Sequence, residues 1–375
     1  MNKIVINAQN ISGGGGLSHL KNLLTAFDEF SNLDFEVELW ASKIIRKKLP
    51  EFKWLLKSNY FLFRIGFIGY LINHVLLLIF KSKIYSNAIY FIPGGWTIIV
   101  TKNTAAMSQN ILPYEPLEIM RFPLLMRIKF HLIRYLQIRT FKKSKKIIYL
   151  SRYASSKISN YINIKNKNTV IIPHGVDEGF YYIRKPEDYR DDFSQFTPCK
   201  LVYVSSIDLY KNHIEVVEAI SKLLKCGLHL HLKIIGPELR GGNDLRKHIA
   251  RLQNLEWVIE FTGNLSPLNL MQELKESDIG IFASSCENLP ISLLEMMASS
   301  LPICCSNLGV MPEVLGDSGI YFDPRNSDEI ANKIDILYKS VEIRNKLGDL
   351  AFKKSQTFTW NNSARKTLKS LGANL

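Results

Sequence analysis

Short apolar segments alternate with amphipathic ones along the second half of the chain, and this rhythm restricts the fold more than any other feature. Strand-length apolar runs occur at 200–206, 230–236, 257–263, 279–285, 302–305 and 320–322, and runs with helical periodicity at 212–225, 243–253, 267–276 and 290–299. Strands that alternate with helices in this way are typical of a parallel, doubly wound sheet. The sequence therefore predicts an α/β domain of Rossmann-like architecture.

The first half of the chain opens in the same way. KIVINA (3–8) is a β-rich run, a glycine loop follows it, and LSHLKNLLTAF (17–27) has helical periodicity. The polar, proline-containing stretch 181–200 separates the halves as a linker would. A chain of 375 residues is long enough for two domains of ordinary size. We therefore predict two Rossmann-like domains that face each other across a cleft.

The net charge of +14 is concentrated in the first half. Residues 1–180 contain 25 Lys and Arg against 10 Asp and Glu, whereas residues 181–375 contain 23 against 24. An excess of one sign in one half indicates that the two halves have different partners. We expect the first domain to face an anionic partner such as nucleic acid, a membrane surface or phosphates.

The segment 122–146 has the composition of a helix that lies on an anionic lipid surface. Its apolar residues recur at helical spacing, and its many Arg and Lys residues lie largely elsewhere. The apolar positions are Leu125, Ile128, Leu132, Leu136 and Phe141. An ordinary helix that packs on a core and solvates its basic face has the same periodicity. Both interpretations stay open from the sequence.

Other features favour a cytoplasmic protein that does not span a membrane. Residues 59–80 approach the length of a bilayer span, but Arg64, Asn73 and His74 interrupt them. The N-terminus lacks the basic and then apolar pattern of a signal peptide. The five cysteines, all in the second half, form no C-x-x-C pair and have no ligand-spaced histidines, which argues against disulfides and structural zinc.

Ligands of doubly wound sheets bind where strands end and helices begin, and the loop SGGGGLSHL (12–20) is one such place. Gly14, Gly15 and Gly16 let the backbone approach a phosphate or a sugar closely. No Gly-Lys-Ser/Thr follows, and Leu17 and His19 come too soon for a dinucleotide fingerprint. A flexible turn explains this loop as well as a binding loop does.

Lys211 and a pair of acids are the other candidates. Lys211 lies close to the start of a helix, where a cation is disfavoured unless an anion is shared there, although a solvated lysine is the plain alternative. In CENLPISLLE (286–295), Pro290 suits a helix start, which puts Glu287 just ahead of the helix and Glu295 inside it. The two acids could share one ligand. Alternatively, Glu287 is only a helix-dipole partner and Glu295 lies on a solvated face.

Residues 283–330 resemble the glycosyl transferases group 1 family, the family 4 retaining glycosyltransferases of GT-B fold. The signature of that family is a Glu, seven residues and a second Glu, as at Glu287 and Glu295. IIPHGVD (171–177), VYVSSIDLYKNH (202–213) and FTWNNSARKTL (358–368) also resemble family segments, and the last is similar to a helix that crosses back to the first domain. The resemblance implies domains at 1–180 and 181–356 and a crossing helix at 357–375. It covers roughly the last 200 residues.

The resemblance also implies a reaction and roles for residues. A hexose-type sugar would move with retention from a nucleoside diphosphate donor to an acceptor held by the first domain. Glu287 would hold the hydroxyls of the transferred sugar, Glu295 the donor ribose, and Lys211 the departing diphosphate. The amides of Leu289, Pro290 and Ile291 would approach the sugar and the diphosphate. With Lys211 and the helix start supplying positive charge, we expect no metal and no cofactor.

Further donor-binding positions are inferred from the same loops, namely Ser206, Gly236 and Asn264. Three positions depart from the family pattern. Ser206 stands where an Arg is frequent, Glu287-Asn288-Leu289-Pro290 replaces a Glu-Gly-x-Gly opening, and the first-domain histidine has no clear counterpart, with Asn110 as its candidate replacement.

Together these features predict a glycosyltransferase of bacterial surface polysaccharide synthesis (O-antigen, capsule or exopolysaccharide). Its acceptor would be a lipid-linked or other saccharide, and the basic first domain would sit peripherally on the inner face of the membrane. A nucleotide-sugar epimerase of the same fold, or an inactive relative that only binds sugar, is the alternative. Nucleic acid is not an expected partner, because no recognised binding motif accompanies the basic half.

Overall fold

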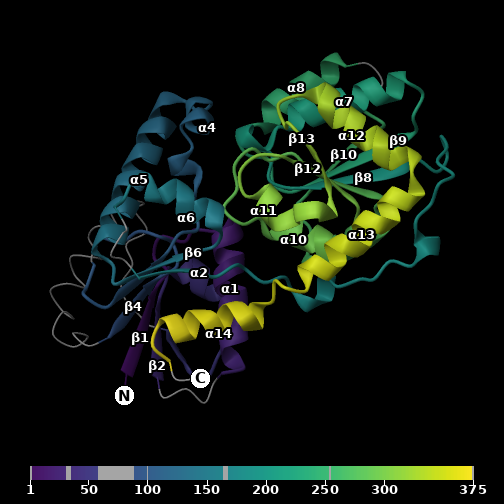
Figure 1. Ribbon diagram of the computed structural model, residues 1–375. Coiled ribbons are helices and arrows are strands. Elements are labelled where there is room, and N and C mark those ends of the chain that lie inside the picture. The colour runs from purple at the N-terminus through teal and green to yellow at the C-terminus, as the bar shows by residue number, and fades with distance from the viewer. Residues whose placement is uncertain are drawn as a thin grey trace. The chain divides into compact units, whose positions relative to one another are not determined.

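The computed structural model describes residues 2–30, 35–57, 88–98, 100–163, 168–252 and 255–373. The chain divides into two compact units (Figure 1). The first unit comprises Met1–Ile119, Pro123–Gly175 and Thr359–Leu375, and the second comprises Met120–Phe122 and Val176–Phe358. The expected domain boundaries, 180/181 and 356/357, lie a few residues from these.

The described part of the first unit contains a parallel sheet of seven strands in the order β3-β2-β1-β4-β5-β6-β7. Its strands are β1 (Asn2–Asn7), β2 (Phe35–Trp40), β3 (Leu55–Lys57), β4 (Ile89–Ile92), β5 (Thr104–Met107), β6 (Lys146–Tyr149) and β7 (Asn168–Ile171). The helices that accompany it are α1 (Gly14–Asp28), α2 (Lys43–Lys47), α4 (Pro116–Met120), α5 (Leu124–Lys143), α6 (Arg152–Ser159) and α14 (Trp360–Ser370). The helix from the end of the chain, α14, packs against α1.

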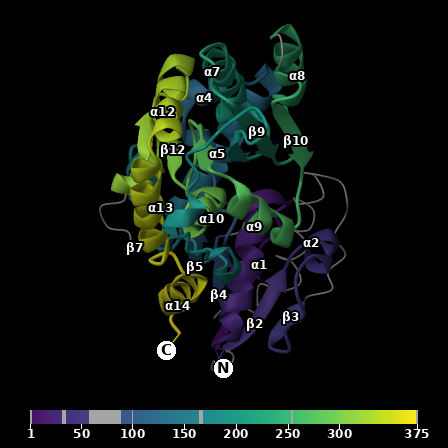
Figure 2. The same ribbon diagram turned by 90° about the vertical axis from the view of Figure 1, so that its right-hand side faces the viewer.

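The described part of the second unit contains a parallel sheet of six strands in the order β10-β9-β8-β11-β12-β13. Its strands are β8 (Cys199–Val204), β9 (Leu230–Ile235), β10 (Ile259–Gly263), β11 (Ile279–Phe282), β12 (Ile303–Ser306) and β13 (Ile320–Phe322). Its helices are α7 (His213–Lys225), α8 (Gly242–Arg251), α9 (Pro267–Glu276), α10 (Ile291–Ala298), α11 (Met311–Leu315), α12 (Ser327–Lys339) and α13 (Val341–Ser355). α7 packs beside α12 and α10 beside α13, and the strands lie between these two pairs (Figures 1 and 2).

Burial on both faces explains the unbroken apolar character of the central strands. Every residue of β11 and of β12 is buried, as is every residue of β5 in the first unit. A strand covered by helices on both sides needs apolar side chains at successive positions rather than at alternate ones. The apolar runs from which the strands were predicted therefore mark the cores of the two units.

The stretch predicted as a linker, 181–200, packs on the second unit. Arg184 is buried there, and its Nε donates a hydrogen bond to the Ser299 carbonyl over 3.2 Å. Arg190 forms an ion pair with Asp278, with 2.6 Å between its Nη2 and Oδ2. The polar residues that suggested a linker are the anchors that hold this stretch in place.

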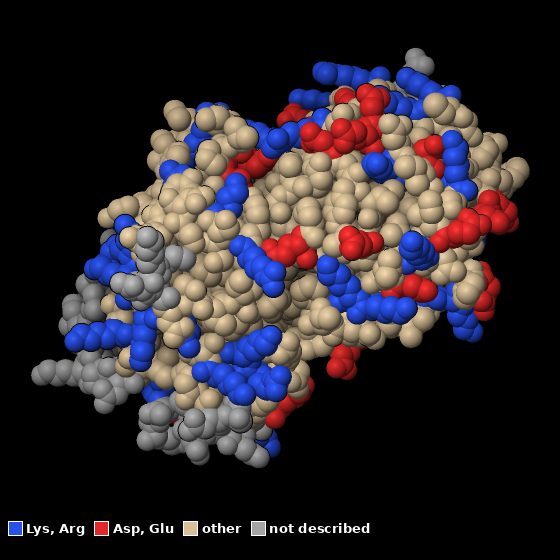
Figure 3. Space-filling view, in the orientation of Figure 1, with Lys and Arg blue, Asp and Glu red and all other residues tan. Residues whose placement is uncertain are grey.

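The charge asymmetry of the sequence is visible on the surface. On the face drawn in Figure 3, Lys and Arg gather on the first unit with few acids among them, whereas the second unit carries both signs interspersed. The apolar segment 59–80 lies outside the described residues. Among the residues that the structure does describe, no helix combines the length and the apolar character needed to cross a bilayer.

Candidate functional site

The strand order of the second sheet creates a switch point between β8 and β11. These two strands are neighbours, but the chain leaves β8 toward β9 on one side and leaves β11 toward β12 on the other. The loops that follow the two strands therefore diverge, and ligands of doubly wound sheets bind at such points. The loops are 205–212 and 283–290.

Lys211 and Glu287 form an ion pair across this switch point. Lys211 ends a single 3₁₀ turn, Leu209–Lys211, and only 8% of the residue is exposed. Burial by itself lowers the pKa of Lys211, but the Glu287 carboxylate outweighs burial and raises that pKa above its usual value. The structure thus brings together the two residues that the sequence assigned to catalysis, with the lysine charged.

Hydrogen bonds between the two loops hold this pair in place. The Asn212 side chain donates to the Ala283 carbonyl over 2.7 Å, and the Ser285 amide donates to the Tyr210 carbonyl over 2.9 Å. Asn212 has a left-handed backbone (φ 52°), a conformation that asparagine tolerates better than most residues. Tyr203, from β8, donates from its hydroxyl to the Lys211 carbonyl over 2.7 Å.

His213 is a site neighbour that the sequence reasoning did not single out. It opens α7, and its ring stacks on Tyr203 with 4.6 Å between ring centroids. Burial, helped by the Lys211 ammonium, lowers the pKa of His213 to about 3, so the imidazole is neutral at physiological pH. In the sequence, His213 is the last residue of the segment KNH, two positions after Lys211.

The start of α10 lies directly after Glu287. Pro290 is the N-cap residue before Ile291, and its side chain provides no hydrogen bond to the free amides of the helix start. Leu289 and Ile291 each have an N–H that can donate to a ligand, but proline has none, so the expectation that the Pro290 amide donates to a ligand is wrong. Only two of the three predicted amides can donate to a sugar or a diphosphate.

Glu295 lies inside α10, where its side chain is largely shielded from solvent. Burial, together with the Asp177 carboxylate, raises the pKa of Glu295 to about 7. A carboxyl group with such a pKa exchanges its proton near neutral pH, so it can either donate to or accept from a hydroxyl group. Glu295 therefore differs chemically from Glu287, although the motif treats them as a pair.

The other predicted donor-binding residues follow the strands on the same edge of the sheet. Ser206 follows β8, Gly236 follows β9 and the exposed Asn264 follows β10. Gly236 has a φ of 147°, and a Cβ added there would lie 2.2 Å from the Ser205 carbonyl oxygen. Only glycine fits this close approach of two loops. Asn264 lies two strands away from β8, farther along the sheet than the others.

Gly14, Gly15 and Gly16 belong to the first unit, where they form the first turn of α1 rather than a loop before it. Gly14 has a left-handed φ of 57°, and nothing lies within 4 Å of a Cβ added at Gly14 or Gly15. Asn110 is exposed after β5 in the same unit. In the described residues of both units, no group of three or more His, Cys, Asp and Glu side chains is placed to hold a metal ion.

Comparison with known proteins finds a family model that matches much of the second unit. Residues 187–354 match the family model described as glycosyl transferases group 1. The GDP-mannose-dependent alpha-(1-6)-phosphatidylinositol dimannoside mannosyltransferase of Mycobacterium tuberculosis is 26% identical over 209 residues, which cover 55% of this chain and 52% of that protein. The O-antigen chain mannosyltransferase B of Escherichia coli is 24% identical over 171 residues, 45% of this chain and 44% of that protein. The chain spans about half the length of the curated relatives it matches.

Solved structures resemble the whole chain. The Anabaena protein HepE, solved in complex with UDP and glucose, superimposes with a TM-score of 0.72 at 16% identity, covering 99% of this chain and 100% of that one. At this identity the likeness concerns the fold. That fold is the predicted one, GT-B with two Rossmann-like units.

Proposed function

We propose that the protein is a glycosyltransferase that uses a nucleoside diphosphate sugar, because residues 187–354 match the model of the glycosyl transferases group 1 family. The observation that carries the proposal is the Lys211–Glu287 ion pair at the switch point of the family-matching unit. A buried lysine beside a carboxylate offers a cation to a diphosphate and an acceptor to sugar hydroxyls at adjacent positions. The relatives described above are named for GDP-mannose dependence and mannosyl transfer, and HepE was solved with UDP.

The proposed reaction breaks the bond between the anomeric carbon of the donor sugar and the diphosphate oxygen. The acceptor hydroxyl forms its new bond on the same face of that carbon, and its proton passes to the departing diphosphate, which gives retention. Lys211 stabilises the charge that develops on the diphosphate, and the uncapped start of α10 adds its amides. Glu287 leaves its ion pair to accept hydrogen bonds from the hydroxyls of the donor sugar.

Glu295 is proposed to bind the ribose of the donor. Two vicinal hydroxyls need an acceptor, and a shielded carboxyl group supplies one once it loses its proton. With a pKa near 7, Glu295 is partly protonated when the site is empty, and a hydroxyl donor would favour its charged form. Nucleotide binding should therefore release protons near neutral pH.

The first unit is proposed to associate peripherally with an anionic membrane on the cytoplasmic side, where a lipid-linked acceptor of surface polysaccharide synthesis would be found. The α5 helix supports this because part of its predicted apolar side is exposed, with Leu125 82%, Ile128 56% and Leu132 43% accessible, while Phe141 at the other end is buried. An apolar stripe of this kind beside cations suits a lipid surface. The name O-antigen chain mannosyltransferase for one relative fits such a pathway.

Membrane association is tested by sedimentation with vesicles that contain phosphatidylglycerol. We expect Leu125→Ser combined with Ile128→Ser to reduce the bound fraction severalfold. The matched double variant Leu239→Ser with Leu268→Ser, at exposed positions of the second unit, should bind like the parent. Equal binding by both double variants would refute the role of α5.

The donor is tested by a thermal-shift screen of nucleoside diphosphates and their sugars against the parent and Glu295→Ala. A nucleotide that raises the melting temperature of the parent by several degrees, and of Glu295→Ala by much less, identifies the donor. A transfer assay with that donor then follows the sugar into acceptor. If no nucleotide or nucleotide sugar stabilises the parent, the proposed function is wrong.

A further inference from the structure

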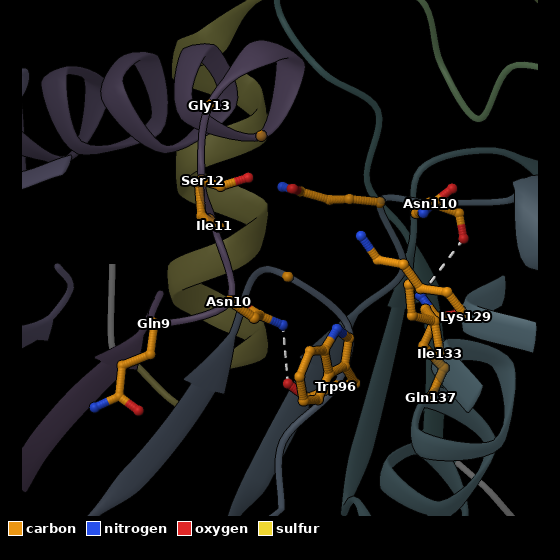
Figure 4. Close-up of a pocket in the computed structure, with 13 residues that line it drawn as sticks. Gln9, Asn10, Ile11, Ser12, Gly13, Trp96, Asn110, Lys129, Ile133 and Gln137 are labelled. Carbon is orange, nitrogen blue, oxygen red and sulfur yellow. Dashed lines mark hydrogen bonds between the residues drawn. The ribbon is translucent and has the colours of Figure 1, made fainter. Parts of the chain in front are cut away.

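The first unit has cavities at both edges of its sheet. The larger one, of about 580 Å³, lies at the carboxyl edge beside the start of α1, where the loops after β1 and β4 diverge (Figure 4). The smaller one, of about 240 Å³, lies at the amino edge, where β4, β5, β6 and β7 begin. Because all strands of this sheet run parallel, the smaller cavity lies at the opposite edge from the loops in which the sequence predicted binding residues.

The starts of four strands form one side of the smaller cavity. It is lined by the first residue of each strand, namely Ile89, Thr104, Lys146 and Asn168. Lys146 pairs with Ala105 of β5 and with Asn168 of β7, and residues paired in this way point to the same face of a sheet. Ala105 contributes only a methyl group to that face, which leaves space beside the Lys146 side chain.

The end of α14 forms the other side of the smaller cavity. The lining residues there are Lys369, Ser370, Leu371 and Gly372. Gly372 has a left-handed φ of 90°, and a Cβ added to it would lie 3.8 Å from the Ile89 Cδ1 atom. The chain therefore turns at this glycine directly beside β4. A ligand in the cavity would contact both the sheet and the last helix of the chain.

Three lysines, Lys145, Lys146 and Lys369, line this cavity, and its lining includes no Asp or Glu. In the described part of the chain, none of their ammonium groups has a hydrogen-bond or ion-pair partner. Burial, and then the adjacent Lys145 ammonium, lower the pKa of Lys146 below its usual value. An anion in the cavity would relieve this repulsion between cations.

Helix ends account for only one of these lysines. α5 and α14 both end at this edge, and the free carbonyls of a helix end attract cations within its last turn. Lys369 lies in the last turn of α14. The last turn of α5 already contains Lys142 and Lys143, whereas Lys145 and Lys146 lie beyond its end. These two cations are therefore more than the helix end requires.

We infer that the smaller cavity binds the phosphate group of a small molecule or of a lipid headgroup. A phosphate monoester carries about two negative charges and three strong acceptor oxygens, which suit three ammonium groups. Lysine binds phosphate as a point charge, and Asn103 and Asn168 add side-chain amides to the lining. A volume of about 240 Å³ is below the range of about 300–1,000 Å³ that is usual for small-molecule sites. The ligand is therefore a phosphate on a short stem rather than a nucleoside diphosphate sugar.

The test is calorimetric titration of the full chain with glycerol 3-phosphate and inorganic phosphate, and with succinate as a dicarboxylate. We expect glycerol 3-phosphate to bind more tightly than succinate. The cavity variant, Lys145→Gln combined with Lys369→Gln, should bind glycerol 3-phosphate about tenfold or more weakly than the parent, because charge-assisted contacts are lost. Lys145→Arg combined with Lys369→Arg keeps both charges and should retain most of the affinity.

The matched control is Lys142→Gln combined with Lys366→Gln, which removes two exposed lysines of α5 and α14 that do not line the cavity. It should bind glycerol 3-phosphate like the parent, and UDP should not distinguish the two double variants. Glycerol 3-phosphate should raise the melting temperature of the parent and of the control, but not that of the cavity variant. The melting temperatures without ligand show that each variant is folded.

Four results would overturn the inference. They are a parent that binds neither phosphate compound, equal glycerol 3-phosphate affinity in the two double variants, succinate binding as tight as that of glycerol 3-phosphate, and a loss of UDP affinity in the cavity variant alone. Sedimentation with vesicles that contain phosphatidic acid separates the two sources of phosphate. A lipid headgroup as ligand should leave severalfold less of the cavity variant than of the control on the vesicles. A free phosphate compound as ligand should leave both double variants equally bound.

Discussion

The carboxyl edges of the two sheets differ in whether their polar groups already have partners. Each edge has a switch point, but the second one is filled by the Lys211–Glu287 ion pair and by hydrogen bonds between its loops. The first one is an open cavity in which, among the residues that the structure describes, the side-chain oxygens of Asn10 and Gln137 have no hydrogen-bond donor. At the second edge, a ligand must break the existing ion pair before Lys211 and Glu287 can bind it. At the first edge, a ligand adds hydrogen bonds to groups that have none.

Removing the lysine of the filled edge should have the largest effect. In Lys211→Ala the diphosphate charge is no longer neutralised, and we expect kcat to fall about 10²–10³-fold. Glu287 also loses its partner. The control is Lys222→Ala, which removes an exposed ion pair with Asp328 and should change kcat little. Sugar transfer from the donor identified by the screen provides the measurement, and a Lys211→Ala enzyme as fast as the parent would end the proposed role of this edge.

The close approach of the loops at the filled edge should be the next most sensitive feature. Gly236→Ala places a methyl group 2.2 Å from the Ser205 carbonyl oxygen, and we expect a loss of about 2–4 kcal/mol in the free energy of unfolding. Gly263→Ala separates the clash from the backbone effect, because Gly263 also has a positive φ (65°) but open space around its Cβ position. Denaturant unfolding, followed by circular dichroism, should therefore give a much lower free energy of unfolding for Gly236→Ala than for Gly263→Ala. Equal losses would mean that the two loops do not approach each other so closely in solution.

Glu295 should destabilise the filled edge as the pH rises. Its pKa is raised from 4.5 to about 7, so the stability carried by its protonated form is complete below pH 4.5 and is lost as the pH passes 7. Glu295→Gln, which imitates the protonated form, should be more stable than the parent by about 1–3 kcal/mol at pH 8 and about equal to it at pH 4.5. Glu256→Gln, at an exposed acid of the same unit, should follow the parent at both values. A stability difference that does not grow with pH would show that Glu295 is charged throughout.

The smallest effect at neutral pH is expected from a buried pair of histidines in the first unit. His19 and His174 are buried together, with 3.2 Å between their Nδ1 atoms, and burial lowers the pKa of His174 to about 3. Stability should be complete above about pH 6.5 and should decline as the pH falls toward 3, by up to about 1.4 kcal/mol per pH unit for each proton taken up. His174→Gln should flatten the decline between pH 6.5 and 5, and His131→Gln, at an exposed histidine, should not. Identical slopes in denaturant melts of all three proteins would exclude the pair as the source.

The architecture was predictable because it depends on patterns that a sequence displays. Each strand and helix expected in the second half is present within a few residues, from β8 to β13, because strands buried on both faces must be apolar throughout. The first half was harder, since its later strands are short and β5 is TAAM, a run with little β-branched character. Its sheet is held by the packing of neighbours rather than by local preference.

The site was predictable only in its residue types. Spacing placed Lys211 near a helix start and Glu287 ahead of another, but their ion pair depends on β8 and β11 being neighbours, which no local pattern specifies. The raised pKa of Glu295 likewise depends on its burial in the fold and then on Asp177, which lies far away in the sequence. Of the residues that line the larger cavity of the first unit, the sequence singled out Gly16 and Asn110. The others were missed, because a glutamine such as Gln137 gives no sign in the sequence that its side-chain oxygen will be buried without a partner among the described residues.

The helix at the end of the chain has a consequence for synthesis of the protein. α14 packs on α1, and the backbone of Trp360 passes so close to Gly175 that a Cβ there would lie 2.1 Å from the Trp360 nitrogen. On the ribosome, α1 is therefore translated early, but its contacts with α14 cannot form until residue 370 has emerged, after the second unit has been translated. If each unit folds as soon as its last residue has been translated, the second unit forms first. The N-terminal unit is then the last part of this chain to complete its fold.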